Sequence, residues 1–550
     1  MNPDPHSKVS NAILLVAVLV CLLQLFWFGS KCFHQIDYDG MAYTGIARHL
    51  SQGQFRSAIN AFRSPLLSWI IAAVSFGRNG LVWVGKWVSV SAFVLSLALL
   101  YAFAKALWRS AMAGAVAVLL FALGRGHSAV AVGMIVPDFL FAALALVYFI
   151  VLLRCLSQGG GEKNWFYLGI VHGLAYLAKS FALPWLALCT LVAAILSDGP
   201  WKKRVTRVVL AALVPVVVTA GWATVLHSKY GVFTAGTQFK ANLLQWTLRA
   251  YRERQDTNYL LLTDTTKHVD EFLVDDPMPP HSWPWTYRID AKRNLPNIIL
   301  AEKRNVPSVL KEIVIVATPG GVLAFIIASC TLLQKRRQYV AEWRVALVIA
   351  TGAVTLVLTY SMLVFDARYL FPLTPLLLAV GAGFLVRGTE LNHEAWRKIS
   401  IALVIAGVAA SLVYPSSPFR RITRDFQAIC YDAGRHLRVH SGSTVVSLGS
   451  GPFPDVGVGW EAGYKAAYFG GWRIIGTAES LPSPSDSSNL MLDLKKASPD
   501  AILVWGKPSE ARYAGLIRHL DEQYPSSTVE SILDPVLGEV GAVVFTNVNR

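Results

Sequence analysis

Two carboxylates lie in a short polar stretch that follows the first long apolar run of the chain. Asp37 and Asp39 come soon after the run Asn11 to Gly29, and the stretch continues to Arg63. A carboxylate can take a proton from an attacking hydroxyl or amine, and a guanidinium can hold a phosphate through two hydrogen bonds. Residues of these types, beside a segment of membrane length, are what a reaction on a lipid-borne phosphate would need.

The residues of this stretch also have simpler interpretations. Asp39 precedes a segment, Met41 to Leu50, with the pattern of a short amphipathic helix, so it could cap that helix as well as accept a proton. Asp37 could assist Asp39 or only be solvated. Arg63 could bind a lipid phosphate or meet ordinary headgroups.

Isolated charges stand beside apolar runs in three further segments. Asp138 follows Pro137 at the start of one run, Lys179 lies where two runs meet, and Arg368 stands next to Tyr369. Ionisable residues that border a membrane are costly and usually functional. The simpler interpretations are that an acid in the first turn favours the helix dipole, and that a lysine extends its ammonium to the membrane surface.

The composition is that of a multi-pass membrane protein. Of 550 residues, 54% are hydrophobic and 15% are charged, and the mean hydropathy is +0.46, whereas about a quarter of the residues of a soluble protein are charged. The net charge of +16 comes mostly from Lys and Arg in short loops between apolar runs, as expected at cytoplasmic membrane ends. The charge therefore does not indicate nucleic-acid binding. The six cysteines are scattered and show no metal-ligand spacing.

The basic clusters, placed inside, define a topology. The N-terminus is cytoplasmic, and the first run is a retained helix because no small-residue cleavage site follows it. The run Pro65 to Gly77 is too short to span and is expected to form an interfacial or re-entrant helix. About eleven membrane spans result, at residues 11–29, 81–107, 110–123, 138–153, 165–178, 181–196, 208–226, 312–333, 345–365, 370–386 and 400–414.

The chain divides into a transmembrane domain, residues 1–414, and a C-terminal domain, residues 415–550. The first has two long outer loops, residues 30–64 and 227–311. In the second, three segments rich in Val and Ile resemble short strands, and one has a helical pattern. These are Ser443 to Leu448, Ala501 to Trp505 and Ala542 to Thr546, and the helical Glu510 to Gln523. We predict an α-helical polytopic membrane protein with a small α/β domain on the periplasmic or extracellular face.

The same topology puts the unusual polar residues on one face. Every acid and base singled out above falls on the outer side, whereas the inner loops carry only plain basic clusters. This one-sided distribution predicts an outer-face site.

Five segments together resemble the GT-C superfamily of membrane glycosyltransferases, most closely the branch of protein O-mannosyltransferases and aminoarabinose transferases, which uses polyprenyl-phosphate sugars. In that family an acid in the first outer loop is followed on one helical face by Tyr and Ala, and Asp39, Tyr43 and Ala47 match it. Ser64 replaces a Pro of the second motif, and Gly40 stands where a second acid is often found. The other four motifs correspond, in order, to Arg63-Ser64-Pro65-Leu66, Pro137-Asp138-Phe139-Leu140-Phe141, Gly173-Leu174-Ala175-Tyr176-Leu177-Ala178-Lys179 and Arg368-Tyr369-Leu370-Phe371-Pro372. The second of these four differs from the family motif by one residue in its spacing.

The resemblance implies an inverting glycosyltransferase of the bacterial inner membrane. Its donor would be a polyprenyl-phosphate sugar reached from the bilayer, and its acceptor a glycan, a lipid or a protein. By this resemblance Asp39 would be the catalytic base that deprotonates the acceptor, and Asp138 would also be catalytic. Binding of substrate and phosphate passes to Asp37, Tyr43, Arg63, Lys179, Arg368 and Tyr369. Cations alone can neutralise a monophosphate leaving group, so no obligatory metal or other cofactor is expected.

Two other classes of protein stay open. A polysaccharide ligase or polymerase would use a diphosphate donor and an arginine-rich outer loop, as Arg249, Arg252, Arg254, Arg288 and Arg293 suggest. A transporter would carry its functional charges near the membrane midplane, which fits the one-sided distribution less well.

Overall fold

In the computed structural model the chain forms two compact units. The first is made of Met1–Ser30, Ala47–Ala250 and Met278–Ile422, and the second of Lys31–Ile46, Tyr251–Pro277 and Thr423–Arg550. The structure describes residues 5–32, 35–75, 80–157, 161–243, 261–262, 291–317, 319–334, 336–363, 366–390, 398, 402, 426–437, 439–449, 460–470, 472–478, 487–506, 511–525, 527–533 and 541–546.

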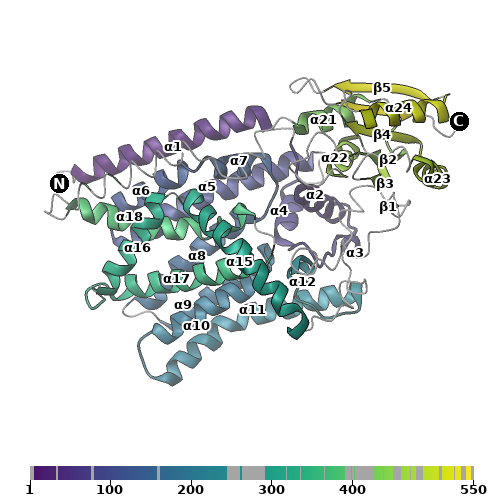
Figure 1. Ribbon diagram of the computed structural model, residues 1–550. Coiled ribbons are helices and arrows are strands. Elements are labelled where there is room, and N and C mark those ends of the chain that lie inside the picture. Colours follow the sequence, from purple (N-terminus) through teal and green to yellow (C-terminus); the bar gives the residue numbers. More distant parts are fainter. Residues whose placement is uncertain are drawn as a thin grey trace. The chain divides into compact units, whose positions relative to one another are not determined.

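The described part of the first unit is helical (Figure 1). Helix α2 (Tyr38–Ser51) belongs partly to each unit. The other helices are α1 (Pro5–Cys32), α3 (Phe55–Ala58), α4 (Leu66–Ser75), α5 (Leu81–Trp108), α6 (Ala111–Ala122), α7 (Arg125–Gly133), α8 (Asp138–Leu156), α9 (Glu162–Ala178), α10 (Ala182–Leu196), α11 (Trp201–Tyr230), α12 (Gln238–Asn242), α15 (Ala291–Val316), α16 (Pro319–Gln334), α17 (Val340–Ser361), the 3₁₀ turn η3 (Ala367–Leu370) and α18 (Thr374–Glu390).

Five of the described helices are long and apolar enough to cross a membrane. They are α1, α5, α8, α11 and α17, and two bent pairs raise the number to seven if each pair is one span. Within the pairs, α6 meets α7 at 66° and α15 meets α16 at 95°. Shorter apolar helices are α4, α10 and the first part of α18. The predicted number of about eleven spans therefore stays a prediction, and residues 400–414 lie outside the described residues apart from Ala402.

The sequence predicted most helices of this unit correctly but missed two features. Helices α2 and α4 occupy the segments predicted as the amphipathic helix and the short run after Pro65. The predicted span 312–333 falls on two helices, because α15 ends at Val316 and α16 is bent from it by 95°. Helix α15 also begins at Ala291, inside the segment predicted to be a loop. Its two prolines, Pro296 and Pro307, concealed the helical pattern.

Close helix contacts depend on small residues and on indole hydrogen bonds. Helices α9 and α11 lie side by side (Figure 1), and Gly169 approaches α11 so closely that a Cβ atom would meet the carbonyl oxygen of Ala211 at 2.6 Å. The indole of Trp108 donates to the carbonyl of Ala379 at 2.9 Å. These contacts hold α9 against α11 and α5 against α18.

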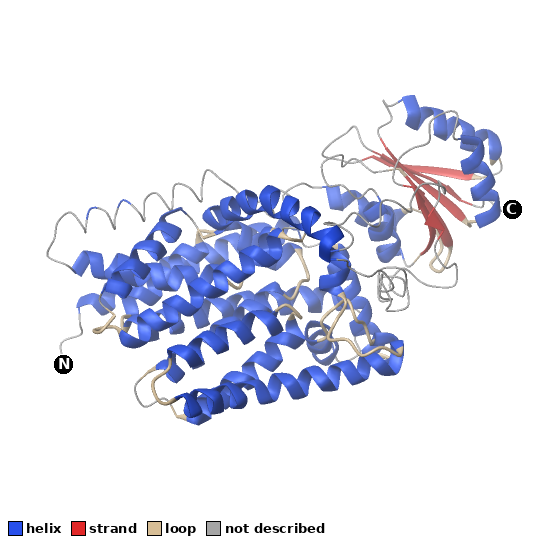
Figure 2. Cartoon of the chain, turned by 60° about the horizontal axis from the view of Figure 1, so that its bottom comes forward, coloured by secondary structure: helices blue, strands red, loops and turns tan. Residues whose placement is uncertain are grey.

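The second unit contains a six-stranded sheet of order β1-β3-β2-β4-β6-β5. Strands β3, β2 and β4 are parallel, and β1, β5 and β6 pair antiparallel with their neighbours. The helices lie on both faces of the sheet (Figure 2). The strands are β1 (Leu261–Leu262), β2 (Thr444–Leu448), β3 (Arg473–Ala478), β4 (Ala501–Gly506), β5 (Thr528–Leu533) and β6 (Gly541–Thr546), and the helices are α21 (Phe426–His436), α22 (Trp460–Gly470), α23 (Ser487–Ala497) and α24 (Ala511–Gln523).

The predicted α/β character of this unit is confirmed. The three predicted strands are β2, β4 and β6, and the predicted helix is α24. Strand β4 is buried along its whole length, as expected of a central strand covered on both faces. The edge strand β5 was missed because polar residues interrupt its apolar pattern.

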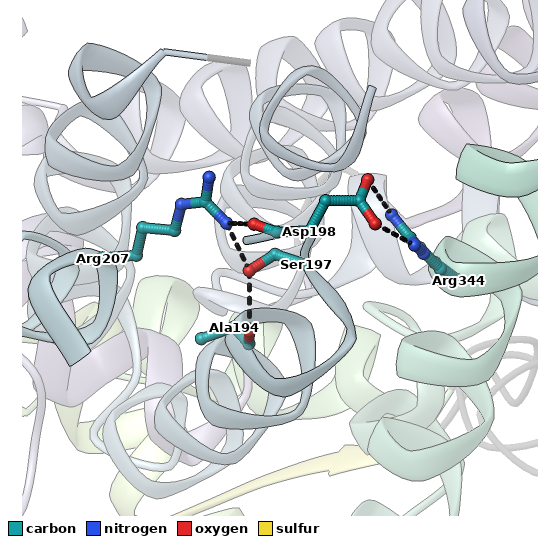
Figure 3. A network of polar contacts seen from close by, with 5 residues as sticks. All are labelled: Ala194, Ser197, Asp198, Arg207 and Arg344. Atoms are coloured by element: carbon teal, nitrogen blue, oxygen red, sulfur yellow. Dashed lines mark hydrogen bonds and ion pairs between the residues drawn. The ribbon is translucent and has the colours of Figure 1, made fainter. Parts of the chain in front are cut away.

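A polar network ties the connection between α10 and α11 to α17 (Figure 3). Arg344 of α17 donates to the two carboxylate oxygens of Asp198 at 2.6 and 2.8 Å. Arg207 of α11 donates to the hydroxyl of Ser197 at 2.7 Å and to the carbonyl of Asp198 at 2.5 Å. Hydrogen bonds from Arg344 lower the pKa of the Asp198 carboxyl below its ordinary value of 3.8.

We expect Asp198→Asn to change stability only slightly. The Asp198 side chain is 71% exposed, and exposed ion pairs contribute at most about 1 kcal/mol. Because the pKa is lowered by folding, this contribution is present above pH 3.8 and is lost as the pH falls through the folded-state pKa. Thermal unfolding of both proteins in detergent, measured from pH 7 to pH 3, should show a small difference that shrinks toward the acidic end. A difference that grows with acidification would contradict this account.

Candidate active site

Asp138 and Lys179 form a buried ion pair. Asp138 is the first residue of α8 and Lys179 directly follows α9. The lysine Nζ lies 2.5 Å from Asp138 Oδ1. The Asp138 side chain is 2% exposed and the Lys179 side chain is 8% exposed. A buried charge needs a partner because desolvation is costly. The ammonium of Lys179 therefore meets a carboxylate instead of extending to the membrane surface.

Tyr369 lies beside both Lys179 and Arg368. The Lys179 Nζ is 4.5 Å from the centre of the Tyr369 ring, and the Arg368 guanidinium carbon is 5.5 Å from it. Tyr360 of α17 stacks on the same ring at 4.6 Å. Cations favour the negative face of an aromatic ring. The tyrosines thus hold two positive groups in one region.

The position of Arg368 is fixed by Asp366. The Asp366 carboxylate accepts from the backbone N–H of Arg368 at 3.1 Å and so caps η3. It also lies 3.4 Å from Arg368 Nε. Sequence reasoning did not single out Asp366, although an aspartate two residues before a turn residue often forms this contact.

The segment that carries Arg63 is held in place by hydrogen bonds. Asn60 Oδ1 accepts from the backbone N–H groups of Phe62 and Arg63, at 2.8 and 2.6 Å. The hydroxyl of Ser64 accepts from the backbone N–H of Ser180 at 3.0 Å. Because Ser64 follows Arg63 and Ser180 follows Lys179, the structure brings these two motifs together. Ser64 makes this bond through a side-chain oxygen that the proline of the family motif lacks.

Together these segments form what we call the basic cluster. It consists of the cations Lys179 and Arg368, the carboxylates Asp138 and Asp366, and the rings of Tyr360 and Tyr369. The segment of Arg63 is joined to it through the hydrogen bond between Ser180 and Ser64. Lys179, Asp138 and Arg63 are all at most 8% exposed. Cations held next to one another, with N–H groups to donate, are suited to bind an anion.

Asp37, Asp39 and Tyr43 lie in the second unit, at the start of α2. The helix begins at Tyr38, so Asp39 lies inside its first turn and Asp37 precedes it. The carbonyl of Asp37 accepts from the N–H of Met41 at 3.0 Å. The residue before the helix is Asp37, two positions before Asp39. The interpretation that Asp39 caps the helix is therefore wrong. Asp39 and Tyr43 are one turn apart and share a face.

No group of three or more His, Cys, Asp or Glu residues close enough to hold a metal ion occurs among the described residues. The expectation of no obligatory metal stays a prediction. Of the arginines in the second outer loop, the first four, Arg249, Arg252, Arg254 and Arg288, lie outside the described residues, and Arg293 lies in α15.

Known proteins share part of this sequence. Residues 63–222 match the family model of dolichyl-phosphate-mannose-protein mannosyltransferases. A curated relative from Pseudomonas paraeruginosa, undecaprenyl phosphate-alpha-4-amino-4-deoxy-L-arabinose arabinosyl transferase, is 33% identical over 177 residues. The corresponding Pseudomonas aeruginosa protein is 32% identical. In both, the matched segment spans 30% of this chain and 31% of the relative.

Solved structures share the fold of the whole chain. ArnT from Cupriavidus metallidurans bound to undecaprenyl phosphate has a TM-score of 0.53 at 13% identity, with 99% of each chain covered. The Archaeoglobus fulgidus oligosaccharyltransferase in complex with zinc and sulfate has a TM-score of 0.54 at 13% identity, covering 97% of this chain and 73% of that chain. The resemblance to GT-C glycosyltransferases is therefore confirmed. The family match includes Arg63, Asp138 and Lys179 and ends before Arg368.

Proposed function

We propose that this chain transfers a sugar from a polyprenyl monophosphate donor to an acceptor on the outer face of the inner membrane. The observation that carries the proposal is the basic cluster, in which Lys179 and Arg368 lie beside the same tyrosine ring and offer N–H groups to a phosphate. The curated relatives are named for an undecaprenyl-phosphate sugar, and one structural neighbour contains undecaprenyl phosphate.

In the proposed reaction Asp39 is the base. It takes the proton of the acceptor hydroxyl or amine as that atom attacks the anomeric carbon from the side opposite the phosphate. The bond between the anomeric carbon and the phosphate oxygen breaks, so the configuration inverts and polyprenyl phosphate leaves. This concerted step places negative charge on the departing phosphate, and nearby cations stabilise such charge most effectively when they are held in position in advance.

The basic cluster supplies those cations. An ammonium has three N–H groups, and within the described residues Asp138 accepts from one of those of Lys179, which leaves two for phosphate oxygens. Arg63 and Arg368 would add guanidinium groups, which bind phosphate oxygens in pairs. Asp138 would orient the Lys179 ammonium. Because these cations can neutralise a monophosphate, we propose that no metal is obligatory.

We expect Arg63→Ala to reduce kcat/KM for the donor by about 10- to 100-fold, the loss typical of a hydrogen bond to a charged group. The kcat/KM of Arg63→Lys should lie between those of Arg63→Ala and the unchanged protein, since lysine keeps the charge without the paired donors. Arg56→Ala is the matched control, because Arg56 lies on α3 in the same outer loop and is exposed. Initial rates at varied donor concentration measure the effect. Equal rates for Arg63→Ala and Arg56→Ala would remove Arg63 from the site.

The alternatives are separated by the donor. Purified protein would be incubated with undecaprenyl monophosphate and diphosphate forms of the same sugars, 4-amino-4-deoxy-L-arabinose among them, with membranes of a strain lacking the protein as the acceptor source. Transfer from monophosphates alone supports the proposal. Transfer from diphosphates alone supports the ligase or polymerase. Donor movement across vesicles without loss of the sugar would indicate a transporter.

A further inference from the structure

The first turns of α2 are bound to helix α22 of the second unit. The hydroxyl oxygen of Thr44 lies 3.0 Å from the hydroxyl oxygen of Tyr468. Thr44 is completely buried, and the two helices lie side by side (Figure 1). Thr44 and Tyr468 are separated by 424 residues, so this contact is a product of the tertiary fold.

The direction of this hydrogen bond follows from the number of protons. Thr44 Oγ1 lies 2.8 Å from the carbonyl of Gly40 and 3.1 Å from that of Met41, and it donates its one proton to them. With that proton donated to the carbonyls, the Tyr468 hydroxyl is the group that can donate to Thr44. Through the Thr44 side chain, Tyr468 is thus linked to the carbonyls of Gly40 and Met41, the two residues that directly follow Asp39.

Helix α22 is itself rigidly held. Gly434 of α21 approaches it so closely that a Cβ atom would lie 2.4 Å from the carbonyl oxygen of Ala466. The rings of Tyr431 and Phe469 meet edge to face at 4.9 Å. Helix α22 also packs on strands β2 and β3. Tyr468 is therefore fixed by the body of the C-terminal α/β domain.

Tyr468 acts on a different side of α2 from the one that carries the proposed base. At 100° per residue, Thr44 lies about 140° around the helix from Asp39, whereas Asp39 and Tyr43 share a face. The contact can hold the helix without occupying the face of Asp39.

We propose that Tyr468 is a positioning residue for Asp39, so that the C-terminal domain holds the base of the reaction in place. This inference rests on the proposed function, in which Asp39 accepts the proton of the acceptor. Small displacements of a catalytic group reduce the rate of the chemical step, whereas they leave the binding of a substrate at a separate site unchanged.

Tyr468→Phe removes the hydroxyl and with it the hydrogen bond to Thr44. We expect kcat to fall about tenfold, with KM for the undecaprenyl monophosphate sugar unchanged. Thr44→Val should have the same effect, and the double variant should be no slower than either single variant. Tyr513→Phe is the matched control, since the buried Tyr513 hydroxyl on α24 has no hydrogen-bond partner among the described residues. It should keep the kcat of the unchanged protein.

A second measurement does not depend on activity. Hydrogen exchange of the backbone amides of residues 40–46 should become faster in Tyr468→Phe and stay unchanged in Tyr513→Phe, because α2 loses an anchor. Unchanged exchange together with unchanged kcat overturns the inference. If the unchanged protein transfers no sugar from any monophosphate donor, the proposed function fails, and faster exchange would still show that Tyr468 holds α2.

Discussion

Asp39→Asn is expected to abolish sugar transfer, with a loss of at least about a thousandfold in kcat, within the range attributed to general bases. Asparagine has nearly the same size as aspartate but cannot accept the acceptor's proton. The protein should still insert and fold, because Asp39 lies in the first turn of α2, and the hydrogen bonds of Thr44 to the carbonyl of Gly40 and to Tyr468 do not involve the Asp39 side chain. Initial rates of transfer by the purified variant measure the loss.

The control for Asp39→Asn is Asp198→Asn, the same substitution at an exposed carboxylate in the polar network of Figure 3. It should transfer sugar at the rate of the unchanged protein. Full activity of Asp39→Asn would remove Asp39 as the base. Equal losses in both variants would attribute the effect to the loss of negative charge in general.

Asp138→Asn is expected to destabilise the protein by about 3–5 kcal/mol, the usual cost of removing one partner from a buried ion pair. The ammonium of Lys179 would stay buried beside a neutral amide, because both side chains are almost inaccessible. Activity should fall as well, since Lys179 would lose its orientation. Denaturant unfolding in detergent measures the stability, and transfer assays below the unfolding transition measure the rate.

The double variant Asp138→Asn/Lys179→Met separates stability from function. Replacing both charges of a buried pair is often nearly neutral, so most of the lost stability should return. Transfer should stay low, because no ammonium is left for the phosphate. A double variant that regains activity as well as stability would show that the pair only supports the fold.

Sequence reasoning identified the elements better than their ends. Apolar periodicity and length revealed most helices, because burial dictates those patterns. The break between α15 and α16 escaped it, since Pro296 and Pro307 obscured the helix and the apolar pattern continues across the bend. Strand β4 was predictable because every residue in it is buried, whereas the partly polar edge strand β5 was not.

For the site, the sequence supplied the charged residues and the structure supplied their partners. Nothing in the sequence pairs Asp138 with Lys179, which are 41 residues apart. The same holds for Ser64 and Ser180, which join two motifs through a side chain where the family has a proline. Asn60 and Asp366 form local turns that their spacing could have indicated. Tyr468 had no local signal, because its partner lies at the other end of the chain.

The central claim is that this chain breaks the bond between a sugar and a polyprenyl monophosphate. The most direct test is mass spectrometry of the carrier lipid released by the purified protein in the presence of EDTA, with undecaprenyl monophosphate and diphosphate sugars supplied separately. The account predicts release of undecaprenyl monophosphate from the monophosphate donors, dependent on Asp39, with the sugar appearing on the acceptor in inverted configuration. Release from diphosphate donors alone, or from neither class, would contradict it.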